Sequence, residues 1–221
     1  MKTYKLYLLR HGLTKANLEG RYCGTMDIPL CEEGIQQLND LVDSCEYPYV
    51  ETVYASPLLR ARETAEILFP GSEYIAVDNL REASFGRFEG IRMKDLQDDE
   101  EFQKWIVPGS DYTPPGVEPS KNFYVRSREG LIQVIDDMMH RGIFSAAVVT
   151  HISVIGACMA ALAYPKHSPY EWNCDPGRGF MVRIDPSLYL REPLVEFVSE
   201  IPFEGQDQTP SDEDPFDYID L

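Results

Sequence analysis

The chain has 221 residues, 43% of them apolar, and is therefore long enough to fold as a single domain around a substantial core. Its net charge is −17, and the last 22 residues hold eight acidic side chains and no Lys or Arg. Nucleic-acid backbones are bound by clustered Lys and Arg, and no such stripe is present in the sequence. We therefore expect no nucleic-acid partner, and a phosphate site here must be built from a few local arginines.

The N-terminal apolar run ends at Arg10, too soon for a signal peptide, so we expect a cytoplasmic protein. The five cysteines are an odd number without a CxxC pair, which argues against a disulfide framework and against a structural zinc site. Residues 145–164 are about as long as a membrane-spanning helix, but Thr150, His151 and Ser153 lie at their middle. We interpret this segment as a strand followed by a buried helix, and we expect no membrane partner.

Strand-like and helix-like patterns alternate along the chain. The predicted strands are 4–9, 52–55, 145–150, 180–184 and 194–199, and the predicted helices are 35–45, 58–68, 131–139 and 152–162. Such alternation predicts an α/β fold with three layers, α/β/α, in which an open, mostly parallel sheet carries helices on both faces.

We expect one domain, residues 1–203. Within it, residues 91–120 are Pro-rich and acidic and include Trp105, which predicts an irregular excursion that acts as a lid or substrate-recognition segment. Residues 204–221 are acidic and weakly hydrophobic, so we predict a disordered tail. This tail is a candidate protein-docking segment, because apolar side chains are spaced among its acids: Phe216, Tyr218, Ile219 and Leu221.

The first candidate site follows the first strand, at Arg10-His11-Gly12. A neutral imidazole is a nucleophile, and Arg offers a planar fork of donors to phosphate oxygens. We expect Gly12 to let the backbone approach an anion, with Thr14 and Asn17 adding small polar groups. We also expect His11 to lie at a surface edge, where its side chain contributes little to packing.

Three further candidates follow other strands or their turns, and ligands in such sheets bind beyond the carboxyl ends of the strands. Arg60 lies near the N-terminus of the predicted 58–68 helix, where its charge adds to the anion preference of the helix, whereas Arg62 is expected on the surface. Glu82 lies in a glycine-containing loop and could protonate a leaving oxygen, its pKa raised beside a phosphate dianion.

His151 follows the predicted strand 145–150 directly, together with Ser56 after 52–55, so we expect both at the same edge as His11. The alternative for a histidine in apolar sequence is a core group with satisfied hydrogen bonds. His140 and His167 lack such a context, and we expect them on the surface.

The chain resembles the histidine phosphatase superfamily, the phosphoglycerate mutase-like group, from Tyr4 to about Ser199. The matching motifs occur in family order: Arg10-His11-Gly12-x-Thr14-x-x-Asn17, Arg21-Tyr22-x-Gly24-x-x-Asp27-x-Pro29-Leu30 with Gly34, Ser56-x-Leu58-x-Arg60-Ala61 with Thr64-Ala65, Leu80-x-Glu82, Pro115-Gly116-x-Glu118 and Val149-Thr150-His151. The resemblance implies that His11 becomes phosphorylated and that Glu82 is the proton donor and later the base. It further implies that the phosphoryl group is bound by Arg10, Asn17, Arg60 and His151, without metal or cofactor.

Within that family, Phe85-Gly86-x-Phe88-Glu89-Gly90 looks like the phosphatase branch, similar to enzymes that act on α-ribazole phosphate and to broad-specificity phosphatases. The expected function is therefore hydrolysis of a small phosphorylated metabolite, α-ribazole phosphate among the candidates. Mutase-type phosphoryl transfer and a non-catalytic phospho-ligand binding module are the alternatives. The oligomeric state stays open, with a homodimer one possibility.

Three positions depart from the family pattern. Leu13 stands where many relatives have Glu, Ile152 follows His151 where glycine is frequent, and Cys31 replaces a common Thr before the helix 35–45. Sulfur is a poorer helix N-cap acceptor than a hydroxyl, so we expect a weak cap at Cys31. None of the three removes a side chain to which the resemblance gives a chemical role.

Overall fold

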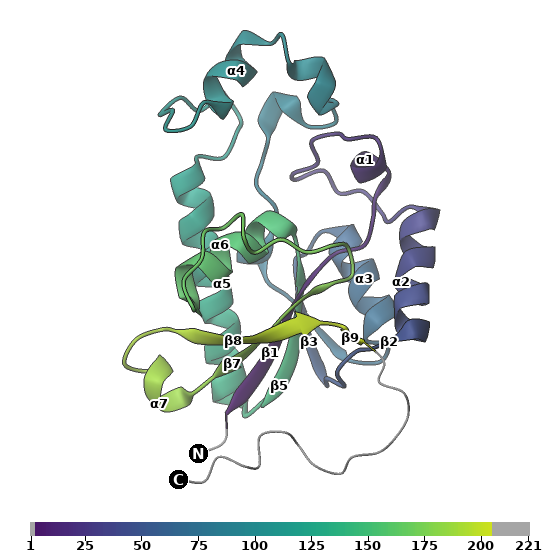
Figure 1. The fold of residues 1–221 in the computed structure, drawn as a ribbon, viewed down its shortest axis with the longest axis vertical. Coiled ribbons are helices and arrows are strands. Elements are labelled where there is room, and N and C mark those ends of the chain that lie inside the picture. Colours follow the sequence, from purple (N-terminus) through teal and green to yellow (C-terminus); the bar gives the residue numbers. More distant parts are fainter. Residues whose placement is uncertain (1–2, 205–221) are drawn as a thin grey trace.

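The structure is a computed structural model that describes residues 3–204. A seven-stranded sheet lies at its centre, in the order β4-β3-β5-β1-β7-β8-β6 (Figure 1). The strands are β1 (Tyr4–Arg10), β3 (Thr52–Ala55), β4 (Glu73–Ala76), β5 (Ser145–Thr150), β6 (Ala163–Tyr164), β7 (Gly179–Ile184) and β8 (Val195–Ile201). Only β7 runs antiparallel to its neighbours, β1 and β8, so the predicted mostly parallel α/β sheet is confirmed. A second sheet pairs β2 (Cys45–Glu46) with β9 (Phe203–Glu204).

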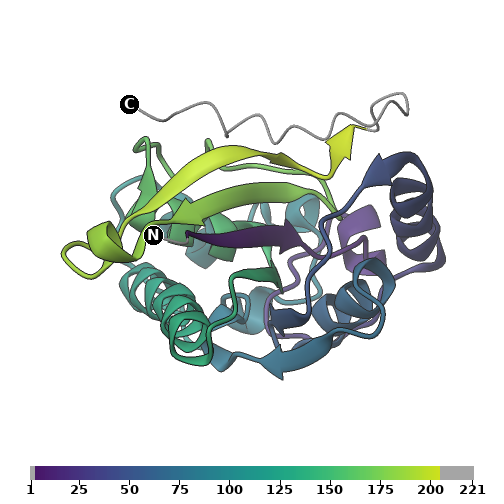
Figure 2. The ribbon, with the colours of Figure 1, turned by 90° about the horizontal axis from the view of Figure 1, so that it is seen from below.

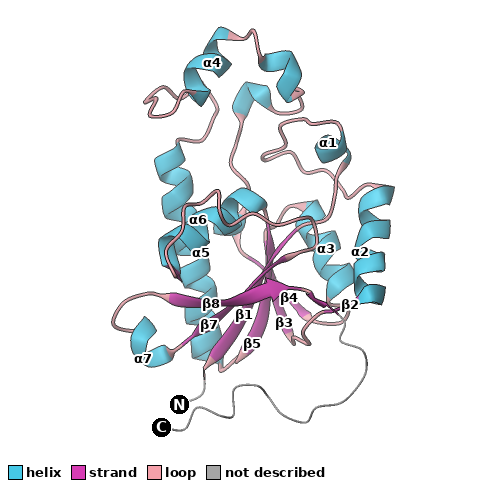
Figure 3. Ribbon diagram, in the orientation of Figure 1, coloured by secondary structure: helices cyan, strands magenta, loops and turns pink. Residues whose placement is uncertain are grey.

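Helices cover both faces of the large sheet, as Figures 2 and 3 show. They are α1 (Lys15–Leu18), α2 (Glu32–Ser44), α3 (Leu59–Leu68), α4 (Glu100–Ile106), α5 (Ser120–Arg141), α6 (Ile152–Leu162) and α7 (Pro186–Tyr189). Successive side chains of a strand point to opposite faces. On β1, Leu6 and Leu8 accordingly pack in the core with α5 and α6, whereas Tyr7 and Leu9 pack with α2 and α3.

Several elements differ from their predictions in extent or existence, among them α5 and β4. Helix α5 begins at Ser120 rather than at 131, because its buried face is continued by the small residues Ser127 and Gly130, which hydrophobic spacing does not register. Strand β4 was not predicted, since it is an edge strand whose side chains are mostly exposed and follow no apolar alternation. By contrast, β5 and α6 have the predicted bounds.

The prediction of an irregular excursion over 91–120 is wrong in part. The segment contains the 3₁₀ turn η3 (Met93–Leu96) and α4, which lie above the sheet in Figure 1. Asp99 caps α4 by accepting from the backbone N–H of Phe102. A small core joins this segment to its surroundings, formed by Phe88, Leu96, Phe102 and Val117 and contacted by Tyr22, Phe85, Ile91 and Trp105. Its role as a lid stays a prediction.

The remaining sequence predictions divide into those that the structure tests and those that it does not. All five cysteines are unpaired, as expected. Over residues 3–204, no helix is long and apolar enough to cross a membrane, and 145–162 form β5 and α6. The predicted tail and its four apolar anchors lie outside the described residues from 205 onward, so its order, its docking role and the division into one domain and a tail stay predictions.

Candidate active site

Three strands end side by side and bring three predicted site residues to one edge of the sheet. Beyond β1, the backbone N–H of His11 donates to the carbonyl of Thr150 (2.9 Å). Beyond β3, the N–H of Ser56 donates to the carbonyl of Val149 (3.0 Å). These bonds extend the sheet past its strands, so His11, Ser56 and His151 lie together, as the sequence predicts.

The imidazole of His11 is held in one tautomer. Its Nδ1 lies 2.7 Å from the carbonyl oxygen of Gly12, which can only accept, so Nδ1 carries the proton and Nε2 carries the lone pair. Arg60 Nε donates to that Nε2 at 3.3 Å. Burial, followed by the charge of Arg60, lowers the pKa of His11 to about 3, so the ring is neutral. With only 6% of its surface exposed, His11 is buried, and the expectation of a surface position is wrong.

Gly12 serves a different purpose from the one predicted. A Cβ at this position would lie 2.8 Å from Leu38 Cδ1, so the glycine allows α2 to pack against the motif. Its N–H donates to Thr64 Oγ1 (2.9 Å) and is therefore not directed at an anion. The glycine is required for packing rather than for anion contact.

Arg60 is 1% exposed, and its guanidinium joins two parts of the site. Nη1 donates to the carbonyl of Met26 (2.8 Å) and Nη2 to that of Gly24 (2.8 Å), while Nε faces His11. Burial lowers the pKa of Arg60, but a guanidinium keeps its charge in proteins. Arg62, on the same helix, is exposed, as expected.

Arg10 and His151 each present a buried nitrogen without a partner in the described structure, Nε of Arg10 and Nδ1 of His151. Arg10 Nη1 donates to the carbonyl of Cys174 (2.8 Å), and His151 Nε2 lies 2.8 Å from Ser56 Oγ. The rings of His151 and His11 are 5.1 Å apart. Burial lowers the pKa of His151 well below its usual range, so this ring is neutral as well. Arg10 Nε is a donor, and so is Nδ1 of His151 in the tautomer in which Nε2 accepts from Ser56 Oγ, and an oxyanion beside His11 would satisfy both.

Glu82 supplies a carboxyl group that is 7% exposed. One oxygen accepts from the N–H of Ala83 (2.7 Å), and the other accepts from Ser153 Oγ (2.5 Å). Burial raises the pKa of Glu82, against the opposing effects of these hydrogen bonds and of Arg60 and Arg126. The raised pKa favours the protonated form that a general acid requires.

The segment that carries Glu82 is fixed from two sides. Thr150 Oγ1 donates to the carbonyl of Leu80 (2.7 Å), which ties the segment to the end of β5. From α5, Arg126 donates to the backbone carbonyls of Asn79, Arg81 and Glu82. Arg126 is itself held by both carboxylate oxygens of Glu118, each at 2.7 Å. The sequence motif pointed to Glu118 but gave no signal for its partner Arg126.

Glu89 joins the loop after Glu82 to the loop before α2. Its carboxylate accepts backbone N–H groups from Thr25 (2.9 Å), Met26 (2.9 Å) and Phe85 (3.1 Å). The two loops are in close contact here, because a Cβ at Gly24 would lie 2.1 Å from the carbonyl oxygen of Ala83. The carbonyls that hold Arg60 thus belong to a loop fixed by the loop of Glu82.

Asn17 is not in hydrogen-bond contact with the other predicted site residues within 3–204. Its Oδ1 accepts from the N–H (3.0 Å) and hydroxyl (2.8 Å) of Thr14, forming a capping box at α1. Its predicted phosphate contact therefore depends on the amide nitrogen. At α2, Cys31 is the N-cap without a side-chain cap bond, as expected.

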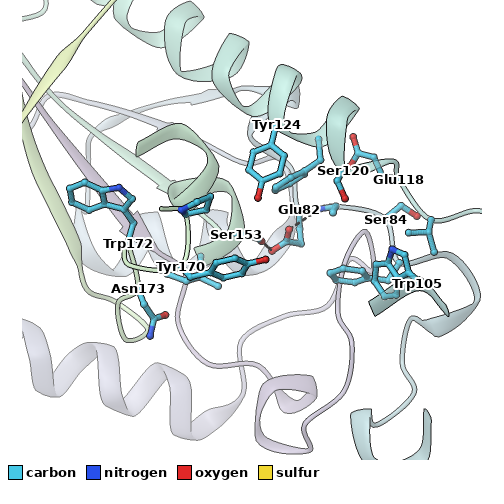
Figure 4. Close-up of a pocket in the computed structure, with 16 residues that line it drawn as sticks. Glu82, Ser84, Trp105, Glu118, Ser120, Tyr124, Ser153, Tyr170, Trp172 and Asn173 are labelled. Carbon is cyan, nitrogen blue, oxygen red and sulfur yellow. Dashed lines mark hydrogen bonds between the residues drawn. The ribbon is translucent and has the colours of Figure 1, made fainter. Parts of the chain in front are cut away.

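A cavity of about 500 Å³ opens beside Glu82 (Figure 4). Six aromatic side chains contribute to its lining: Phe85, Trp105, Phe123, Tyr124, Tyr170 and Trp172. Its charged lining residues are Glu82 and Glu118, and no described lining residue is Lys, Arg or His. In Figure 4, Tyr124 and Tyr170 lie on one side of Glu82 and Trp105 on the other.

Most of this aromatic wall was missed by the sequence reasoning, which named only Phe85 and Trp105 among the six residues. Tyr124 lies on α5, and Tyr170 and Trp172 lie in the loop after β6, in stretches without a motif. Across residues 3–204, no group of three or more His, Cys, Asp or Glu side chains is arranged to hold a metal ion. Near Glu82, the structure thus offers arginine charges and an aromatic cavity.

Comparison with known proteins places the chain in a family. A profile of the histidine phosphatase superfamily, branch 1, matches residues 6–187. The adenosylcobalamin/alpha-ribazole phosphatase of Salmonella typhimurium is 29% identical over 178 residues, covering 78% of this chain and 87% of the relative. Phosphoserine phosphatase 1 of Hydrogenobacter thermophilus is 27% identical over 207 residues, 87% and 97% of the two chains.

The fold agrees with these relatives. The crystal structure of the alpha-ribazole phosphatase from Shigella flexneri matches with a TM-score of 0.75 at 23% identity, covering 92% of this chain and all of the other. With a family profile over most of its length and phosphatases among its relatives, this chain belongs to branch 1 of the histidine phosphatase superfamily and is a phosphoric monoester hydrolase.

Proposed function

We propose that this phosphatase hydrolyses small phosphomonoesters whose alcohol part is aromatic or apolar, through a phosphohistidine at His11, with α-ribazole phosphate as the first candidate substrate. The observation that carries the proposal is the aromatic cavity at Glu82, where a leaving group would lie. Aromatic side chains bind apolar rings by stacking and by burial of their surface. The alpha-ribazole phosphatase among the relatives supports the same substrate class.

The proposed first step uses the geometry around His11. Nε2 carries the lone pair because Nδ1 faces the carbonyl of Gly12, and the hydrogen bond from Arg60 Nε to it is given up when substrate binds. Nε2 then attacks phosphorus while the bond from phosphorus to the leaving oxygen breaks. Glu82 gives its proton to that oxygen, and the alcohol departs into the cavity. Arg10, Arg60 and His151 bind the phosphoryl oxygens, with Asn17 as a further donor. Their preorganised charges stabilise the transferring group.

In the second step, water attacks the phosphohistidine. Glu82, now a carboxylate, takes a proton from the water, and the bond between phosphorus and Nε2 breaks to release phosphate and the neutral imidazole. The same side chain thus serves as acid and then as base. We propose that neither step requires a metal or an organic cofactor.

The lining of the cavity argues against substrates that carry a carboxylate. Phosphoserine and phosphoglycerate would place that group in a cavity where no described lining residue is Lys, Arg or His to bind it. This weakens the mutase alternative and separates the proposal from the phosphoserine phosphatase relative. A binding module without turnover would have no need of a neutral His11 or of a buried Glu82 with a raised pKa.

The test is a substrate panel assayed with EDTA present: α-ribazole 5′-phosphate, p-nitrophenyl phosphate, phosphoserine and 3-phosphoglycerate. We expect kcat/KM for α-ribazole phosphate to exceed that for phosphoserine by roughly 10²-fold, since an unpaired buried charge costs a few kcal/mol. Acid-quenched enzyme should contain phosphohistidine. A preference for phosphoserine, or loss of activity with EDTA, would contradict the proposal.

Glu82→Gln provides the test of the acid. We expect hydrolysis of alkyl phosphates to fall by roughly 10²–10⁴-fold, because their leaving oxygen needs the proton. The rate of p-nitrophenyl phosphate hydrolysis should fall far less, because its leaving group departs as a stable anion. The ratio of kcat/KM for the two substrates, wild type against variant, is the measurement. Equal losses on both would remove Glu82 from the acid role.

A further inference from the structure

We infer that Ser153 is a positioning residue that holds the carboxyl group of Glu82 toward the leaving-group cavity. The inference rests on the proposed function, since it concerns the orientation of the proposed acid. Ser153 is the second residue of α6, which begins directly after His151. The first turn of this helix therefore reaches both the phosphate-binding edge and the acid.

The contact is short and joins distant parts of the chain. Ser153 Oγ lies 2.5 Å from Glu82 Oε2, and both residues line the same cavity (Figure 4). The bond links α6, which follows β5, to the loop after β4, across 71 residues of the chain.

Two hydrogen bonds are required to fix both oxygens of the carboxyl group. The N–H of Ala83 holds Oε1 at 2.7 Å and comes from the adjacent residue, so it restrains one end only. The terminal torsion of Glu is soft, and the group can rotate about this single bond. Ser153 adds the second point, from a helix that is itself packed in the core. A general acid must lie within hydrogen-bond reach of its acceptor, so this restraint affects turnover.

Charged groups surround Glu82 on several elements, and they set the direction of the pH effect. Arg10 on β1, Arg60 on α3 and Arg126 on α5 favour its ionised form, while the Cys23 thiol also lies near it. Burial raises the pKa of Glu82 despite them, and the hydrogen bond from Ser153 opposes that rise. Removing the hydroxyl therefore moves the pKa of Glu82 further up.

The experiment compares Ser153→Ala, Ser153→Thr and the control Ser120→Ala. Ser120 lines the same cavity, but in the described structure it makes no hydrogen bond to Glu82. kcat/KM is measured against pH for an alkyl phosphate, glycerol 2-phosphate, and for p-nitrophenyl phosphate. For the alkyl ester, activity falls as pH rises through the pKa of Glu82, because the acid loses its proton.

The alkaline limb is the part of the pH profile in which kcat/KM for the alkyl ester falls as pH rises. With Ser153→Ala we expect this limb to move to higher pH by about one unit, and kcat at the optimum pH to fall about tenfold without a change in KM. kcat/KM for p-nitrophenyl phosphate should change by less than about twofold. Ser153→Thr keeps the hydroxyl and should restore both the limb and the rate. Ser120→Ala should follow the wild type.

An unmoved limb in a folded Ser153→Ala variant would overturn the inference, as would equal losses on both esters. Glu82→Gln is measured in parallel. If this variant hydrolyses the alkyl ester as fast as the wild type does, the proposed function fails. If Glu82→Gln loses alkyl-ester hydrolysis as expected while the alkaline limb of Ser153→Ala stays in place, only the inference about Ser153 is refuted. Circular dichroism checks folding. If Ser153→Ala does not fold, Ser153→Cys, a weak donor, replaces it with the same expected shift.

Discussion

The proposed phosphate-binding cluster and the proposed leaving-group cavity lie side by side but are constructed differently. His11, Arg60 and His151 are buried at strand and helix ends, and their partners are largely backbone carbonyls and the side chain of Ser56. The aromatic wall of the cavity comes instead from side chains on α4, α5 and two loops, some of them widely exposed, such as Tyr170 at 88%. We expect turnover to depend on the first region and selectivity to depend on the second.

This contrast teaches where substitutions should be tolerated. A buried residue that several backbone groups hold cannot change without leaving them unpaired, which is costly. An exposed aromatic side chain on a loop can be replaced with little effect on the fold. Three substitutions test whether the first region controls turnover and the second controls selectivity.

The largest effect is expected for His11→Ala, which removes the nucleophile. Hydrolysis of p-nitrophenyl phosphate should fall on the order of 10⁴-fold or more, and no phosphohistidine should be trapped. Because His11 is buried and bonded to Arg60, we also expect a loss of about 1–3 kcal/mol in unfolding free energy, which a thermal melt would show. The exposed His140→Ala is the matched control and should change neither quantity. Substantial residual turnover in His11→Ala would place the nucleophile elsewhere.

Next in size is Arg60→Lys, paired with Arg62→Lys on the same helix. Lys keeps the charge at position 60 but lacks the planar fork that reaches Gly24, Met26 and His11 together. We expect kcat/KM to fall by roughly 10²–10³-fold. Arg62 is exposed, so its variant should remain close to the wild type. Similar losses in both variants would contradict the role given to the fork of Arg60, because Arg62 makes none of these contacts.

The smallest effect is expected in the cavity wall, with Tyr170→Ala against Tyr49→Ala, which is similarly exposed at 84% but lies outside the cavity. Loss of one stacking surface should raise KM for aromatic phosphates by about threefold to tenfold and leave kcat nearly unchanged. Steady-state kinetics with α-ribazole 5′-phosphate would show this. A fall in kcat instead of a rise in KM would indicate that Tyr170 takes part in the chemical step. It would contradict the assignment of turnover and selectivity to separate regions.

The sequence predicted that His11, Ser56 and His151 lie at one edge of the sheet, because each directly follows a strand. Arg10, His11 and His151 follow strands whose apolar patterns are clear, and parallel strands place their carboxyl ends together. It could not show that His11 is buried, or that Gly12 packs on Leu38, because both depend on how α2 lies against the motif.

Little in the sequence indicates the cavity. Tyr124 lies within a 22-residue helix, and Tyr170 and Trp172 lie in an irregular loop, so neither spacing nor motif relates them to Glu82. Helix α4 was missed because Pro and acidic residues dominate the composition around it, although Asp99 and the two glutamates after it are an N-terminal helix signal. Ser153 went unassigned because its partner lies 71 residues away.

Glu89 has a consequence for engineering this scaffold. Its carboxylate spans two loops, residues 24–26 and 83–90, and the first of them supplies the carbonyls that orient Arg60. A chimera that imports only one of these loops from a relative would separate Glu89 from its donors and shift the guanidinium relative to the nucleophile. The two loops are best exchanged as a single cassette, whereas the aromatic positions of the wall can be randomised one at a time.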